Sequence, residues 1–226
     1  MSEQEVLPIL QRVGALITNS HLVYTSGRHG SSYVNKDALF PHTAETSQIC
    51  ALLAAHFAAA GIEVVAGPTI GGVIMAQWVA HHLSQLSGRP VLAVYAEEEG
   101  SGAERRRVFR RGYGDLLTGR RVLAVEDVLT TGGSVRMVFA AIAQQGGNVV
   151  GLGALYNRGG LHAAELGVPD FYALLDMPLD SWDEADCPLC QAGTPINTSV
   201  GKGAAFLAKA SRQEHRSTRR CEETRR

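Results

Sequence analysis

The chain has 226 residues, of which 45% are hydrophobic and 19% charged, a composition typical of a globular protein. It contains no run of about 18 apolar residues and its N-terminus is acidic and polar, so we expect neither a membrane span nor a secretory signal. The formal net charge of −1 hides an asymmetry, because residues 202–226 sum to +5 and the remainder to −6. Seven cations of that acidic remainder lie between Arg105 and Arg121.

Helix-like and strand-like segments alternate along the chain. Apolar residues spaced by three or four predict helices, and short apolar runs predict strands. In chain order, the predicted helices are 6–17, 46–60, 73–86 and 135–145, and the predicted strands are 63–66, 91–95, 121–125 and 149–156. Strands separated by helices indicate parallel βαβ units, so the sequence predicts an α/β fold on a parallel sheet.

Three further segments fill in this outline. The strand at 121–125 is apolar on both faces, as a central strand covered by helices would be. Residues 96–120 are polar and rich in Glu, Arg and Gly, and we expect a long mobile loop there. We expect one domain over residues 1–205 and a basic, disordered tail over residues 206–226.

Cysteine usage indicates a reducing compartment. Four cysteines in a chain of this length do not make a disulfide framework, so we expect a cytoplasmic protein. Cys187 and Cys190 form a lone Cys-x-x-Cys, which supplies two thiolates where a zinc site needs four ligands. Three interpretations stay open: a turn with two partly buried thiols, a redox pair, or a zinc site completed by residues elsewhere or by a second subunit.

The segment after the predicted central strand carries the chemistry. Ligands of open parallel sheets bind at the carboxyl ends of strands, where this chain has Glu126-Asp127-Val128-Leu129-Thr130-Thr131-Gly132-Gly133-Ser134. Adjacent carboxylates are costly to bury unless hydroxyl groups or a cation pair with them. The glycines let backbone N–H groups close around a small anion, and the following helix N-terminus favours phosphate. The pattern fits a ribose 5-phosphate; the alternative is a helix N-cap after two surface acids.

The phosphate site is of neither common nucleotide-binding kind, because the chain has no Walker motif and no Gly-x-Gly-x-x-Gly after a strand. Instead, residues 122–134 resemble the signature with which type I phosphoribosyltransferases bind phosphoribosyl pyrophosphate (PRPP). The order of five motifs is similar to that of the orotate phosphoribosyltransferases: Ser26-Gly27-Arg28, Gly67 to Gly72, the segment 96–120, the PRPP signature and Asn157-Arg158. The resemblance implies the type I fold, a parallel sheet with helices on both faces and a small hood formed by the N-terminal and C-terminal segments.

The resemblance also implies a role for each motif. Glu126 and Asp127 would be catalytic, holding the ribose hydroxyls and supporting the developing oxocarbenium ion. PRPP would bind residues 126–134 and also Thr69, Ile70 and Gly71. Orotate would bind at Tyr33, Val34, Thr130 and Arg158, with its carboxylate on Arg158. Mg²⁺ would be carried mainly by PRPP itself, with no direct protein ligand assigned.

The charged segment departs from the family's pattern. Orotate enzymes usually carry Lys and His there for pyrophosphate, whereas residues 96–120 contain neither. Arginine forks suit phosphate oxygens, so we expect Arg105, Arg106, Arg107 and Arg111 to bind the pyrophosphate; the alternative is a solvated run of charge. Thr25 stands where the family usually has a basic residue, and the nearby cations are Arg28 and Lys36.

Taken together, these observations predict a Mg²⁺-dependent orotate phosphoribosyltransferase that acts as a homodimer and has no membrane partner. The alternatives are a phosphoribosyltransferase for another base and a non-catalytic PRPP-sensing or RNA-binding regulator on the same fold. We do not expect nucleic acid as a partner, because the basic tail has no aromatic residue after Phe206 on which bases could stack.

Overall fold

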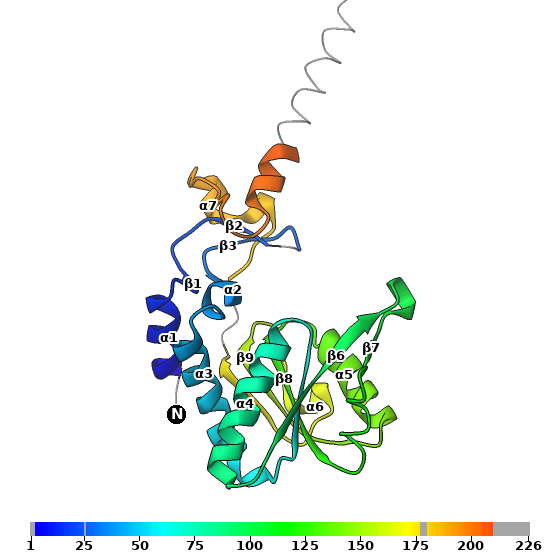
Figure 1. The fold of residues 1–226 in the computed structure, drawn as a ribbon. Helices are drawn as coiled ribbons and strands as arrows, with labels where there is room; N and C mark the ends of the chain where they lie inside the picture. The colour runs from blue at the N-terminus through cyan, green and yellow to red at the C-terminus, as the bar shows by residue number, and fades with distance from the viewer. Residues whose placement is uncertain (1–2, 25, 177–179, 210–226) are drawn as a thin grey trace, which may run out of the picture. The chain divides into compact units, whose positions relative to one another are not determined.

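The computed structural model describes residues 3–24, 26–176 and 180–209, and the chain divides into two compact units (Figure 1). Unit 1 comprises Met1–Ala15 and Asn35–Pro178, and unit 2 comprises Leu16–Val34 and Leu179–Arg226. No helix in the described ranges is long and apolar enough to span a membrane. Residues 203–209 are helical, and the rest of the expected basic tail lies outside the described residues.

Unit 1 is built on a six-stranded sheet with the order β10-β9-β8-β5-β6-β7. The strands are β5 (Val64–Pro68), β6 (Leu92–Glu99), β7 (Arg106–Val108), β8 (Arg121–Leu129), β9 (Asn148–Asn157) and β10 (Phe171–Leu175). Every neighbouring pair is parallel except β6 and β7. The predicted α/β fold on a parallel sheet is therefore confirmed.

Helices cover both faces of this sheet. Those of unit 1 are α1 (Glu3–Arg12), α2 (Lys36–Leu39), α3 (Thr43–His56), α4 (Gly71–Ser87), α5 (Gly133–Gln144) and α6 (Ala163–Leu166), with 3₁₀ turns at Ala58–Ala60 and Gly102–Glu104. Val64 and Ala66 pack with Val138 of α5 in one buried cluster. On the other face, a Cβ added to Gly153 would contact Leu53 of α3 at 3.3 Å. Alternate residues of each strand thus pack against different helices, which explains why these strands are apolar throughout.

Unit 2 is small and combines an N-terminal with a C-terminal segment of the chain. Its short antiparallel pairs are β1 (Leu16–Ile17) with β4 (Tyr33–Val34) and β2 (Leu22–Val23) with β3 (His29–Gly30), followed by a 3₁₀ turn at Glu184–Asp186 and α7 (Pro188–Gln191). Backbone hydrogen bonds join the two segments, since His29 and Trp182 exchange N–H···O bonds of 2.8 Å each. This composition matches the hood implied by the resemblance.

Several predicted boundaries differ from the structure, two of them substantially. The helix predicted over 6–17 ends at Arg12, because Gly14 adopts a positive φ of 68° that does not continue a helix. The segment 96–120 is not one long loop, because β6 runs to Glu99 and pairs with β7 in an antiparallel hairpin at the sheet edge (Figure 1). Glu and Arg side chains face each other across this hairpin, and opposite charges on facing strands stabilise such a pair.

Candidate active site

The central strand β8 continues beyond the point at which its pairing with β5 ends. β8 pairs with β5 only as far as Ala124, whereas it pairs with β9 as far as Leu129. The strand predicted to end at residue 125 thus continues through Glu126 and Asp127 and ends at Leu129. The loop from β5 into α4 lies directly beside them, since a Cβ added to Gly71 would lie 1.8 Å from Oδ2 of Asp127.

The two adjacent carboxylates of β8 point to opposite faces of the strand. Glu126 is on the same face as Ala124 and interacts with the side chain of Ser134, in the first turn of α5. Asp127 is on the other face, against the first residue of α4. Each carboxylate therefore lies near the N-terminus of a different helix, where the helix dipole favours negative charge.

Burial affects these two carboxylates differently. Burial, followed by the neighbouring Asp127, raises the pKa of Glu126 to about 8. Asp127 instead has a cation, because Nζ of Lys36 lies 3.1 Å from its Oδ2. Burial lowers the pKa of Lys36, but the attraction of Asp127 outweighs this and holds that pKa above its usual value. Asp127 is therefore a paired carboxylate, whereas Glu126 holds its proton near neutral pH.

The loop between β5 and α4 brings its backbone close to the site. A Cβ on Gly67 would lie 2.3 Å from the carbonyl oxygen of Gly72, so only glycine allows this tight turn. Between them, the Thr69–Ile70 peptide is cis and the Ile70 side chain is 78% exposed. Thr69, Ile70 and Gly71 thus lie in a narrow backbone turn at the end of β5, next to Asp127.

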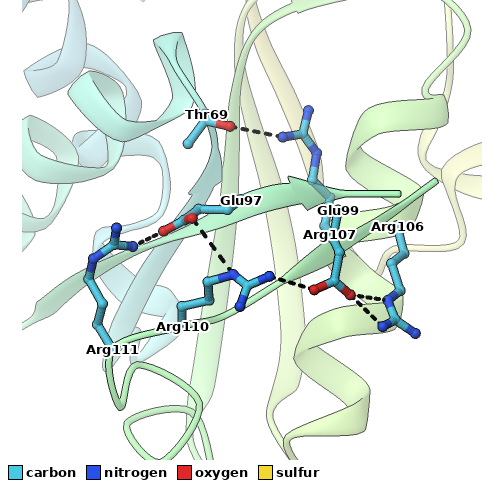
Figure 2. A network of polar contacts seen from close by, with 7 residues as sticks. All are labelled: Thr69, Glu97, Glu99, Arg106, Arg107, Arg110 and Arg111. Carbon is cyan, nitrogen blue, oxygen red and sulfur yellow. Dashed lines mark hydrogen bonds and ion pairs between the residues drawn. The ribbon is translucent and has the colours of Figure 1, made fainter. Parts of the chain in front are cut away.

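Arg107 of β7 links this loop to the turn at residues 130–134, and Figure 2 shows its contact with Thr69. Its Nη1 donates to Oγ1 of Thr69 at 3.0 Å, and its Nη2 donates to Oγ of Ser134 at 3.3 Å. The residue is only 8% exposed, and its Nε is buried without a hydrogen bond among the described residues. A buried guanidinium between two loops rich in hydroxyl groups and glycine is a strong binding group for phosphate oxygens.

Arg107 also has an acidic neighbour, because its Nη2 lies 3.5 Å from Oε2 of Glu98. The other arginines of the hairpin are paired with glutamates as well (Figure 2). Arg106 donates from Nε to Glu99 at 2.7 Å, and Arg111 forms an ion pair with Glu97. Arg105 lies 3.9 Å from Glu98. The structure therefore brings Arg107 to the predicted phosphate loops but not Arg105, Arg106 or Arg111.

The predicted phosphate motif, Thr130 to Ser134, forms the turn from β8 into α5. Gly132 has φ of 72° and serves as the N-cap of α5, and the N–H of Gly133 lies 3.4 Å from Oγ1 of Thr131. Arg136, which the sequence prediction did not include, donates to the carbonyl oxygen of Thr131 at 2.6 Å. The sequence signal that could have identified Arg136 is its position, as a cation in the first turn of the helix that follows the motif.

The end of β9 lies beside the end of β8. Asn157 is fully buried; its Nδ2 donates to Leu161 and Asp176 at 2.9 Å each and fixes the following turn. The N–H of Arg158 donates to the carbonyl oxygen of Leu129 at 2.9 Å. The structure therefore brings the backbone of Arg158 next to the predicted phosphate motif.

The remaining predicted residues belong to unit 2. Tyr33 and Val34 form β4, where Val34 is buried and Tyr33 half-buried. Of the two cations considered in place of Thr25, Lys36 lies at the carboxylates, whereas Arg28 forms an ion pair of 2.8 Å with Asp183 within unit 2. Thr25 itself lies outside the described residues.

Comparison with known proteins identifies the family. A family model described as phosphoribosyl transferase domain matches residues 35–184. The chain is also 40% identical over 195 residues to an orotate phosphoribosyltransferase of Pelotomaculum thermopropionicum, which covers 86% of this chain and 95% of that relative. The chain belongs to the orotate phosphoribosyltransferase family.

Two solved orotate phosphoribosyltransferases also resemble the chain. The enzyme from Aeropyrum pernix has a TM-score of 0.60 and 27% identity, covering 74% of this chain and 92% of that one. The enzyme from Mycobacterium tuberculosis H37Rv, solved in complex with PRPP, has a TM-score of 0.56 and 27% identity, covering 76% and 94%. The type I phosphoribosyltransferase fold inferred from the motifs is therefore confirmed.

Proposed function

We propose that the chain transfers the phosphoribosyl group of PRPP to orotate, giving orotidine 5′-phosphate and pyrophosphate. The nitrogen of orotate forms a bond to the anomeric carbon of the ribose as the bond to pyrophosphate breaks. One observation carries the proposal: two buried carboxylates lie between a hydroxyl-rich turn and a glycine loop that Arg107 connects. The solved M. tuberculosis relative in complex with PRPP supports this choice of substrate.

The carboxylates of β8 act on the ribose. The hydroxyl groups of a ribose donate to Asp127 and Glu126, and the negative charge there stabilises the positive charge that develops at the anomeric carbon. Lys36 forms an ion pair of 3.1 Å with Asp127 and places a positive charge beside it. Because the pKa of Glu126 is raised to about 8, Glu126 is mostly protonated near neutral pH and becomes a stronger acceptor once it ionises.

The two loops beside the carboxylates take the two phosphate groups. The turn Thr130 to Ser134, at the N-terminus of α5, suits the single 5-phosphate. The tight turn around Thr69 suits the pyrophosphate, because its glycines leave the backbone open to a close approach. Arg107 contacts both loops, and its forked donors would hold pyrophosphate as it leaves.

Orotate is recognised by the residues next to this site. Arg158, at the end of β9, pairs with the orotate carboxylate, and Thr130 lies at the adjacent end of β8. Tyr33 and Val34 are proposed as further contacts of the pyrimidine. An anionic base favours a cation here, whereas a neutral purine does not.

The residues at the carboxyl end of β8 also fit Mg²⁺. Carboxylate and hydroxyl oxygens are the ligands that Mg²⁺ prefers, and Glu126, Asp127 and Thr130 offer them. Mg²⁺ would arrive mainly on the phosphates of PRPP and would neutralise part of their charge. We propose further that the protein works in the cytoplasm as a homodimer. Light scattering of the purified chain would measure its oligomeric state.

A panel of bases tests this function. Turnover with PRPP is measured for orotate, uracil, adenine and hypoxanthine, and orotate alone should be consumed. Arg158→Ala should raise the KM for orotate about 10- to 100-fold through the loss of a charge-assisted contact, with little change in PRPP binding. Arg89→Ala is the matched control, since Arg89 is exposed and precedes the amino end of β6, whereas the site lies at the carboxyl ends of the strands. Turnover of another base in place of orotate would mean that this other base is the substrate. PRPP binding without turnover of any base would favour a non-catalytic regulator.

A further inference from the structure

Unit 2 contains a group of four metal-ligating side chains that the proposed reaction does not use. Their ligand atoms all lie within 4.8 Å of one another, and three of the residues are buried. We call this group the His/Cys cluster; its members are His21, His29, Cys187 and Cys190. All four lie outside residues 35–184, the range matched by the family model.

The ligand atoms of the cluster converge on one point. Sγ of Cys190 lies 3.5 Å from Nε2 of His21 and 3.3 Å from Nδ1 of His29. Sγ of Cys187 lies 3.7 Å from Nε2 of His21. A tetrahedral Zn²⁺, with bonds of about 2.3 Å to sulfur and about 2.0 Å to nitrogen, would place its ligand atoms roughly 3.3–3.8 Å apart. The cluster is therefore close to the dimensions of a zinc site.

The two histidines each direct one ring nitrogen into the cluster, where both nitrogens can present a lone pair to a cation. Nδ1 of His21 lies 2.7 Å from the carbonyl oxygen of Thr194, so in the neutral ring this nitrogen carries the proton and Nε2 presents a lone pair to the cluster. That Nε2 lies 2.9 Å from Nδ1 of His29. Without a cation, Nδ1 of His29 must carry the proton that it donates to Nε2 of His21, whereas Nε2 of His29 is buried without a partner among the described residues in either state. With a cation, both facing nitrogens donate their lone pairs to it.

The local backbone brings the four ligands together from both segments of unit 2. Cys187 and Cys190 are three residues apart around the first turn of α7, so their side chains project to the same side. His21 directly precedes β2 and His29 is the first residue of β3, and the N–H of Asn197 donates to the carbonyl oxygen of His21 at 2.7 Å. The cluster therefore joins the hairpin near residue 25 to the chain near residue 190.

We propose that the His/Cys cluster binds one structural Zn²⁺ ion that holds the two segments of unit 2 together. Two thiolates and two neutral imidazoles give Zn²⁺ an overall neutral site, which suits burial, and this ligand set is a common structural zinc site. A redox pair fits less well, because Cys187 is fully buried and thiol exchange needs a reachable sulfur. Unit 2 also has few buried apolar side chains in its described part, and small units with small cores often depend on a metal.

Elemental analysis of the untagged full-length chain, purified with reductant, tests the proposal. We expect about one zinc per chain, and we expect the chain to keep this zinc in competition with a zinc-binding dye. Cys190→Ser and His29→Ala should release the zinc into the dye at least tenfold more readily than the wild-type chain. The matched controls Cys50→Ala, in unit 1, and His81→Ala, on the exposed face of α4, should retain it.

Replacement of zinc by Co²⁺ in the wild-type chain gives a second readout that does not require any variant to fold. The spectrum should show thiolate-to-cobalt charge transfer and the visible bands of tetrahedral Co²⁺. Three results would overturn the proposal: a reduced, folded chain that binds no added Zn²⁺, a Cys187–Cys190 disulfide in protein isolated with reductant, or ligand variants that keep zinc as tightly as the controls.

Discussion

The two units of the molecule are stabilised in different ways. Unit 1 buries strands that are apolar on both faces between helices, and clusters of buried side chains extend across its sheet from β6 to β9. In the described part of unit 2, the buried apolar side chains are Leu22, Val23, Tyr24, Val34 and Cys187. Unit 2 instead has a buried His/Cys cluster.

Buried polar groups have a different role in each unit. In unit 1, the large apolar core tolerates two adjacent carboxylates at the end of β8, and one of them has its pKa raised to about 8 as a result. These carboxylates serve the proposed reaction. In unit 2, the buried polar groups take the place of a core, and the proposed Zn²⁺ is a structural element. A change in one unit should therefore leave the other largely unaffected.

The largest expected effect is at the carboxylates of β8. Asp127→Asn removes a charge that stabilises the transition state, and kcat should fall on the order of 100- to 1,000-fold. Steady-state kinetics with orotate and PRPP measure this. The zinc content of the variant should equal that of the wild-type chain, and a loss of zinc together with activity would show that the two units are not independent.

The next effect distinguishes Arg107 from the other arginines of the hairpin. Arg107→Lys keeps a charge but loses the fork between Thr69 and Ser134, and the KM for PRPP should rise about 10- to 100-fold. Arg106→Lys is the matched control, because Arg106 is exposed and pairs with Glu99. Equal effects of the two changes on the KM for PRPP would mean that the whole run of arginines binds pyrophosphate, as the sequence had suggested.

Chelation of zinc should separate the two units directly. Removal of the ion should speed amide exchange at least about tenfold at His29, Trp182 and Asn197, whose N–H groups join the two segments of unit 2. The strands of unit 1 should exchange as before. Hydrogen exchange followed by mass spectrometry measures both, and unchanged protection in unit 2 would argue against a structural role for the ion.

The smallest effect concerns the stability of unit 1 with pH. The folded chain holds the proton of Glu126 up to about pH 8, whereas the unfolded chain releases it near its ordinary pKa of 4.5. The contribution of Glu126 to stability therefore falls as the pH rises through this range, by on the order of 1 kcal/mol or more. Glu126→Gln should flatten the dependence of the melting temperature on pH, and a profile as steep as that of the wild-type chain would contradict the shift.

The chemistry of unit 1 could be predicted from the sequence because it is local. The carboxylates, hydroxyl residues and glycines of residues 126–134 are contiguous, so their order alone indicates a strand end followed by a phosphate-binding turn. The apolar strand before them predicts the parallel sheet. The order of these residues does not predict that β8 extends beyond its pairing with β5, because this depends on where the neighbouring strands end.

The features that the sequence missed are nonlocal. The hairpin of β6 and β7 arises from Glu and Arg residues that pair across strands, whereas each run alone is typical of a solvated loop. The partners of Cys187 and Cys190 are more than 150 residues away, at His21 and His29. No spacing rule joins such distant residues until the fold brings the two segments together.

Product analysis tests the central claim most directly. The wild-type chain and Asp127→Asn are each incubated with orotate, PRPP and Mg²⁺, and orotidine 5′-phosphate and pyrophosphate are quantified together. We predict that the wild-type chain forms the two products in equal amounts and that the variant forms them far more slowly. No orotidine 5′-phosphate from the wild-type chain, or equal rates for the two proteins, would contradict catalysis at the carboxyl end of β8.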